Sequence, residues 1–171
     1  TVSVLYEAEL QGMKLQMVNI QSKPNKSLIM MMMMGNTMMK MVFDGENGSI
    51  TQQGMTSPMP EDLAKDLNSQ SQPFVQIGWL NDDNVMFSSV EEENGKTLYV
   101  LEKTGASGKS LTYFDANTGL KVKSIEYGEM PDGSIVPSTS YFDDYREVDG
   151  VLFPYYFSLP LGPQNLEMSV I

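Results

Sequence analysis

Residues 139–159 read TSYFDDYREVDGVLFPYYFSL, two β-prone stretches joined by Asp149-Gly150. An Asp-Gly pair between such stretches is a strong signal for a tight hairpin, because both residues tolerate the positive φ of the turn. The pattern recurs in two further pairs of stretches: 85–91 with 96–103, and 110–114 with 120–127. This half of the chain is therefore predicted to fold as consecutive antiparallel hairpins.

The first sixty residues extend the same pattern. Apolar and polar residues alternate between Val2 and Leu10, which is typical of a strand with one buried and one hydrated face. Further strands are predicted at 13–17, 28–34, 37–43 and 50–53, separated by turn residues.

One clear helix is predicted to begin near Pro60, with Glu61 and Asp62 in its first turn, where the helix dipole favours acids. Residues 74–80 are apolar and fit either a strand or a short helix. Strands and helices do not alternate along the chain, so the predicted class is mainly β, with an antiparallel sheet of about eleven strands and one main helix. Residues 1–171 are expected to form a single domain.

Composition excludes several kinds of chemistry. The 171 residues include 11 Lys and Arg against 22 Asp and Glu, a formal charge of −11, and contain no Cys and no His. Without these two residue types, thiolate nucleophiles, Ser-His-Asp catalysis and Cys- or His-based zinc sites are absent. An acidic surface repels phosphate backbones, which disfavours nucleic acid as a partner.

Four local features of the sequence are candidate sites. Gly105–Ser110 resembles the end of a phosphate-binding loop but lacks the first glycine and is followed by strand-like residues, so a hairpin loop is predicted. Residues 81–84 and Asp143-Asp144 offer oxygen ligands without calcium-loop spacing, and solvated turns are expected. Arg146 fits a structural ion pair with neighbouring acids or, alternatively, a contact to a ligand headgroup.

Methionine is the informative residue type. The chain has 15 Met, five of them at positions 30–34 and others at 38, 39 and 41, on neighbouring predicted strands. Side chains on paired strands lie about 5 Å apart, so these must form a patch. Met is unbranched and adapts to irregular partners, whereas rigid cores favour Leu, Ile, Val and Phe. The patch fits a surface for a flexible apolar ligand and, equally, a sheet–helix core.

Several segments together suggest a family. They are VFDGENG at 42–48, the helix start PEDL at 60–63, YFDANTGLKV at 113–122 and YFDDYREVDGVLFP at 141–154. In this order they resemble the outer-membrane lipoprotein carrier family, the LolA/LolB-like group, and its periplasmic relatives. The resemblance implies an incomplete antiparallel β-barrel with a helix over its open side, a hollow for acyl chains and no catalysis. It also implies a periplasmic or lipid-anchored location in the envelope of a Gram-negative bacterium.

The predicted function is non-enzymatic binding of a hydrophobic ligand, a lipid or a lipoprotein acyl chain, in a Met-rich hollow. No cofactor, metal ion or nucleic acid is expected, and an envelope protein is a possible partner. The predicted lining comprises Met30, Met32, Met39, Met41 and Phe43, with Phe74 and Trp79 on the covering segment. Met31 and Met33 replace their neighbours if the strand has the opposite parity.

Two alternatives stay open. One is an accessory domain, of the kind attached to secreted pitrilysin-like peptidases, with the hollow filled by its own side chains. The other is a hydrolase that depends on Asp or Glu, for which the sequence offers no substrate.

Overall fold

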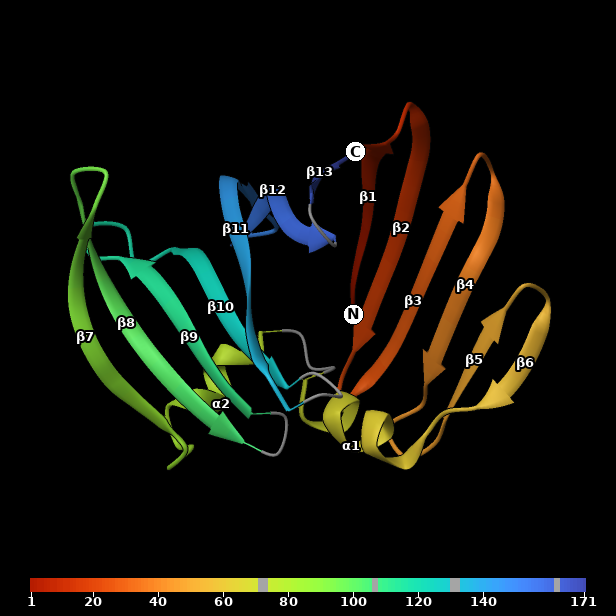
Figure 1. Ribbon diagram of the computed structural model, residues 1–171, viewed down its shortest axis with the longest axis horizontal. Coiled ribbons are helices and arrows are strands. Elements are labelled where there is room, and N and C mark those ends of the chain that lie inside the picture. Colours follow the sequence, from red (N-terminus) through yellow and green to blue (C-terminus); the bar gives the residue numbers. More distant parts are fainter. Residues whose placement is uncertain (71–73, 106–107, 130–132, 162–163) are drawn as a thin grey trace. The chain divides into compact units, whose positions relative to one another are not determined.

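A computed structural model describes residues 1–70, 74–105, 108–129, 133–161 and 164–171. The chain divides into two compact units, the first formed by Thr1–Gly78 with Met168–Ile171 and the second by Trp79–Glu167. The first unit contains β1 (Val2–Leu10), β2 (Met13–Ser22), β3 (Lys26–Met33), β4 (Asn36–Phe43), β5 (Gly48–Gln52), β6 (Met55–Pro58) and helix α1 (Glu61–Gln70). Figure 1 shows β1 to β6 side by side in chain order.

The second unit contains the remaining hairpins. Its strands are β7 (Val85–Glu93), β8 (Lys96–Gly105), β9 (Gly108–Asp115), β10 (Lys121–Glu129), β11 (Ile135–Val148) and β12 (Val151–Leu161). The short helix α2 (Gln76–Trp79) and the last strand β13 (Gln164–Val170) each contribute residues to both units.

The strands form one open sheet with the hydrogen-bonded order β6-β5-β4-β3-β2-β1-β13-β12-β11-β10-β9-β8-β7. The mainly β, antiparallel class is thus confirmed, but the described chain has thirteen strands instead of about eleven. Strand β6 contributes to the difference, because its four residues are all exposed and give no buried alternation. The expectation of one main helix is corrected by α2, which settles the open choice at 74–80 as a short helix.

Tight turns set the register of the hairpins. Among the described turns, five have two residues each: Gln11-Gly12, Met34-Gly35, Gln53-Gly54, Asn94-Gly95 and Asp149-Gly150. Both residues of each loop have positive φ, 50° to 52° for the first and 75° to 81° for the glycine. These dihedrals are those of the type I′ turn, whose twist matches that of the flanking strands. Glycine is needed at the second position because a Cβ opposes that conformation.

Two longer turns are each held by an aspartate. The Asp44 Oδ1 accepts hydrogen bonds from the backbone N–H groups of Glu46 (2.9 Å) and Asn47 (2.8 Å). Asp115 Oδ1 accepts from Asn117 (2.8 Å) and Thr118 (3.1 Å) in the same way. These hydrogen bonds lower the pKa of both carboxyl groups, because they favour the charged form. The predicted turns after Phe43 and Phe114 are confirmed.

The second unit has its own small core. Leu98, Val100 and Tyr113 are buried together, and Leu111, Val122 and Ile125 pack against them. Lys123 covers Tyr113, with its Nζ 4.1 Å from the ring centroid, and forms an ion pair with Glu93. Branched and aromatic side chains therefore form this cluster, and the aliphatic part of the Lys123 side chain covers its tyrosine.

The other motifs have structural roles. Gly105 pairs with Gly108 across β8 and β9, and a strand follows, as predicted in place of a phosphate loop; residues 106 and 107 lie outside the described residues. Arg146 Nε and Nη2 donate to the two carboxylate oxygens of Asp144, at 3.1 and 2.6 Å. The ion-pair interpretation of Arg146 is therefore confirmed.

Candidate ligand-binding face

A bulge in the β3–β4 hairpin decides which methionines share a face. After the Met34-Gly35 turn, Met33 pairs with Asn36 and Met32 with Thr37. The register then shifts by one residue at Met38, so that Met31 pairs with Met39. An unshifted hairpin would have paired Met30 with Met39, because each step along one strand is matched by one step back along the other.

The register places a set of methionines on one face of the first unit. Because direct cross-strand partners project to the same side, the pairs Met17↔Met31 and Met31↔Met39 form a row across β2, β3 and β4. Residues two positions along a strand share its face. We define the methionine face as the side of this sheet that carries Met17, Met31, Met33, Met39, Met41 and Phe43.

The two sides of this sheet differ in charge. Among the described strand positions of the first unit, those on the methionine face include no Asp, Glu, Lys or Arg. The opposite side carries the ion pair of Glu7 and Lys14 (2.5 Å), and Gln16 donates to the same carboxylate at 3.2 Å. Lys40 also lies there, opposite Met30. An apolar ligand would therefore bury no charge on the methionine face.

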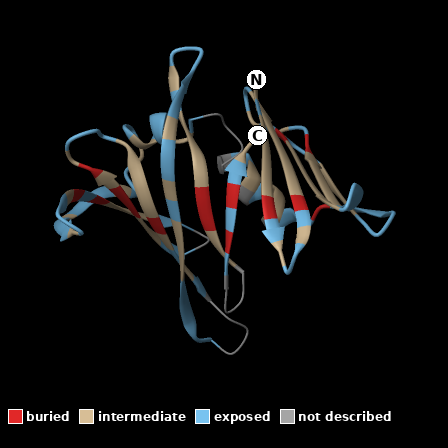
Figure 2. Ribbon diagram, turned by 90° about the horizontal axis from the view of Figure 1, so that it is seen from above, coloured by how far each residue is buried: buried red, intermediate tan, exposed pale blue. Residues whose placement is uncertain are grey.

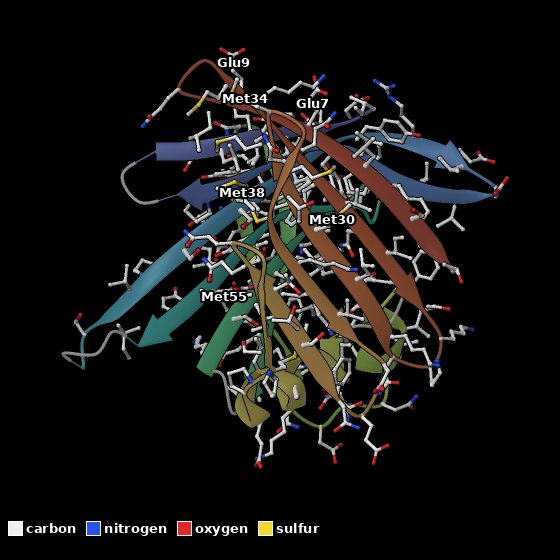
Figure 3. The ribbon with its side chains drawn as sticks, turned by 90° about the vertical axis from the view of Figure 1, so that its right-hand side faces the viewer. Glu7, Glu9, Met30, Met34, Met38 and Met55 are labelled. Atoms are coloured by element: carbon white, nitrogen blue, oxygen red, sulfur yellow. The ribbon has the colours of Figure 1, made fainter. Side chains whose placement is uncertain are left out.

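The methionine face is incompletely covered. Phe43, Leu15 and Ala8 are buried, but Met17, Met31, Met33, Met39 and Met41 are only half-buried. Figure 2 shows this as short red stretches within largely tan strands. Three further methionines of the first unit are exposed, and they are Met34 in its turn, Met38 at the bulge and Met55 in β6 (Figure 3). Met55 is the most exposed of them and, as the partner of Gln52, lies on the same side of the sheet as the methionine face. Flexible apolar side chains are thus within reach of solvent or a ligand.

The chain leading into α1 packs on the methionine face. The Met59 N–H donates to the Gly48 carbonyl at 2.9 Å, and Met59 is buried. A Cβ added to Gly48, which pairs with Phe43, would lie 2.6 Å from Met59 Sδ and 3.0 Å from its Cβ. Gly48 therefore leaves the space that Met59 fills beside Phe43. This contact fixes the start of α1, whose first hydrogen bond runs from Ala64 to Pro60 (3.0 Å).

Polar side chains also lie within the same face, among them Asn19 and Tyr6. Asn19 sits between Val4 and Ile29, and its Oδ1 is buried with no hydrogen-bond partner among the described residues. Tyr6 lies opposite Met17, and burial raises the pKa of its hydroxyl. Both observations indicate a poorly hydrated surface with few hydrogen-bonding groups.

The predicted lining residues do not all lie together. Met39, Met41 and Phe43 share the methionine face, whereas Met30 and Met32 lie on the opposite side of the sheet. There Met30 Sδ accepts a weak hydrogen bond from Thr37 Oγ1 at 3.8 Å. The grouping of Met30 and Met32 with Met39 is therefore corrected, and the reason is the bulge at Met38.

Met31 and Met33 take the positions on the face. A run that is apolar at every residue contains no period-two signal, so the sequence left both parities open. The Met34-Gly35 turn alone would have favoured Met30, and no residue type marks the bulge that reverses this. The bulge leaves Met38 without a partner on β3, and this extra residue is visible only in the pairing of the two strands.

The predicted covering residues lie in different units. Phe74 belongs to the first unit and is 38% exposed, and Trp79 belongs to the second. The Lys103 Nζ lies 5.8 Å from the Trp79 ring centroid, and the buried Trp79 Nε1 has no partner among the described residues. Their role in covering a ligand stays a prediction.

No group of three or more His, Cys, Asp or Glu residues in the described part of the chain is arranged to hold a metal ion. No described helix has the length and apolar character needed to cross a membrane.

Comparison of the sequence with family models and with curated proteins finds no match. Solved structures are similar in fold. A LolA superfamily protein from Nitrosomonas europaea is 16% identical, with a TM-score of 0.65 over 99% of this chain and 82% of that one. A DUF1329 family protein from Desulfovibrio piger is 10% identical, with a TM-score of 0.62 over 99% and 82%.

A third structure is described as an outer membrane lipoprotein-sorting protein domain from Vibrio parahaemolyticus. It is 11% identical, with a TM-score of 0.60 over 98% of this chain and 81% of that one. These identities are low, but the alignments span nearly the whole chain. The chain therefore has a LolA-like fold.

Proposed function

We propose that residues 1–171 form one domain that binds a lipid or a lipoprotein acyl chain on the methionine face, without catalysis. Its location would be the periplasm or the envelope surface of a Gram-negative bacterium, where an envelope protein would deliver or accept the ligand. The observation that carries this proposal is the charge-free face of half-buried methionines around Met31 and Met39. The similarity to a lipoprotein-sorting domain supports it at the level of fold.

The physical basis is apolar burial. Each methylene group removed from water contributes about 0.8 kcal/mol, so a chain of several carbons gains enough to offset the loss of its freedom. Methionine suits such a ligand, because its unbranched side chain follows an irregular apolar surface. The proposed lining is Met31, Met33, Met39, Met41 and Phe43, with Phe74 of the same unit as a candidate covering residue.

Adjacent residues of one strand provide a matched test. Delipidated protein is titrated with a fluorescent fatty-acid probe, comparing Met31→Asp with Met30→Asp. The two substitutions make the same chemical change in β3 but on opposite faces. We expect a loss of probe affinity of roughly tenfold or more for Met31→Asp, because the ligand would bury a carboxylate, and little change for Met30→Asp.

Far-UV circular dichroism of each variant checks that the sheet is retained. Equal losses in both variants would contradict the assignment of the face. Absence of saturable binding to the wild-type protein, relative to a denatured control, would reject the proposal and favour the accessory-domain alternative.

A further inference from the structure

The row formed by Met17, Met31 and Met39 brings three thioether sulfurs to neighbouring positions. The residues are direct cross-strand partners on β2, β3 and β4. Their Cβ atoms are therefore spaced by about 5 Å, and each side chain has three rotatable bonds with which to place its sulfur. Three sulfurs can thus converge above Met31 without any movement of the backbone. Met33 and Met41, two residues along β3 and β4, supply further sulfurs on the same face.

Thioether sulfur is a soft, uncharged ligand that selects Cu(I) over hard cations. The chain has no Cys and no His, so the residue types that usually hold Zn²⁺ or Cu²⁺ are missing. The described strand positions of the methionine face also include no carboxylate for Ca²⁺ or Mg²⁺. The ligand type that the row of Met17, Met31 and Met39 offers is therefore thioether sulfur, which suits soft cations.

The surroundings of the row agree with a cation of low charge. Tyr6 lies opposite Met17 at one end and Gln52 lies opposite Met39 at the other. Ile29 and Met41 are paired in the next row, so the immediate environment is apolar. Moving a doubly charged ion into such an environment costs more than moving a singly charged one. The methionines are half-buried, which leaves the sulfurs open to an incoming ion.

We propose that Met17, Met31 and Met39 form a thioether site for a soft monovalent cation, Cu(I), with Met33 or Met41 as an additional ligand. The site shares its face with the proposed lipid-binding surface but rests on a different property of the same residues, the sulfur atom instead of the apolar volume. Binding of Cu(I) at this site can therefore be tested independently of lipid binding.

The test uses Ag(I), which has the same preference for soft ligands, and Cu(I) kept reduced by ascorbate under anaerobic conditions. Protein labelled with ¹³C at the methionine methyl groups is titrated with Ag(I) and followed by NMR, and Cu(I) affinity is measured by competition with bicinchoninate. We expect the methyl signals of Met17, Met31 and Met39 to shift first. The exposed Met34 and Met86 should respond only at excess metal.

Leucine substitutions test the sulfur atom, because Met→Leu removes the sulfur and keeps the apolar volume. Met31→Leu is expected to lower Cu(I) affinity by roughly tenfold or more, because it removes one thioether ligand. Met30→Leu, on the opposite face of β3, is the matched control and should leave Cu(I) affinity unchanged.

Three results would overturn the metal site: no competition for Cu(I) by the wild-type protein, equal losses in Met30→Leu and Met31→Leu, or first shifts at Met34 and Met86. A loss of probe binding in Met31→Asp alongside normal metal binding by the wild type would uphold both proposals. Metal binding without probe binding would uphold this site and reject the lipid-binding function.

Discussion

The small core of the second unit and the methionine face of the first are built from different side chains. Leu98, Val100 and Tyr113 are at most 4% exposed and close on one another, with a lysine over the tyrosine ring. The methionines around Met31 are flexible and half-buried, and no described side chain seals them in the same way. Residues that are stiff and fully packed stabilise the fold, whereas the flexible, accessible ones offer a surface for a ligand.

The largest expected effect is the difference in stability lost when a core residue and a residue of the methionine face are each truncated. Leu98→Ala removes a buried side chain, so we expect the free energy of unfolding to fall by about 3 kcal/mol. Met31→Ala removes a side chain that is already half in contact with water, and its cost should stay below about 1 kcal/mol. Urea unfolding of both variants measures the difference, and similar losses would show that the methionine face is part of the core.

A second prediction concerns charge, which the methionine face lacks and the second unit contains. Lys121 Nζ lies 3.8 Å from the Phe142 ring centroid, and burial lowers the pKa of this lysine to about 8. The unfolded chain holds its proton up to about pH 10.4, so folding releases a proton between these values and stability rises with pH. Below pH 8 the lysine is charged in both states and its effect is constant.

We expect unfolding free energy to increase by about 1 kcal/mol between pH 8 and 9.5, and Lys121→Met to abolish this increase. Tyr145 limits the upper end of the window. Its hydroxyl donates to the Lys121 carbonyl at 2.7 Å, and burial raises its pKa to about 12, so stability is lost above pH 10 as the unfolded tyrosine ionises. A slope that persists in Lys121→Met would contradict the assignment to this lysine.

The smallest expected effect concerns the first residue of two tight turns, one in each unit. The first unit places Met34 at φ 50° in a two-residue loop, where the second unit has Asn94 at φ 51°. Asparagine tolerates this conformation better than methionine. Met34→Asn should therefore raise the unfolding free energy by about 0.5 kcal/mol, and Asn94→Met should lower it by a similar amount. Thermal unfolding of the pair checks the opposite signs.

Sequence patterns were sufficient for the class of fold, because each hairpin signal is local. Asn94-Gly95 and Asp149-Gly150 predict their turns from residue chemistry alone, and the structure confirms them. Strand β6 is not predicted by the sequence pattern, because Met55–Pro58 are all exposed and show no alternation of buried and exposed residues. The LolA-like fold was predicted from longer motifs, not from periodicity.

The candidate site was less accessible to sequence reasoning. Met39, Met41 and Phe43 were assigned to one side because polar neighbours alternate with them, and the register agrees that they share a face. Met30 and Met32 were grouped with them wrongly, since the bulge at Met38 is a property of the paired strands together. A residue pattern within one strand cannot encode a shift relative to its partner.

The two outermost strands have a consequence for solubility. Strand β6 is short and ends at Pro58, which has no N–H to offer a neighbouring chain, and β7 ends in Glu91, Glu92 and Glu93. Proline and clustered like charges both hinder the docking of a further strand. A chain this rich in sulfur-bearing apolar residues is thereby protected against growth into cross-β fibrils, even while its sheet remains open at both ends.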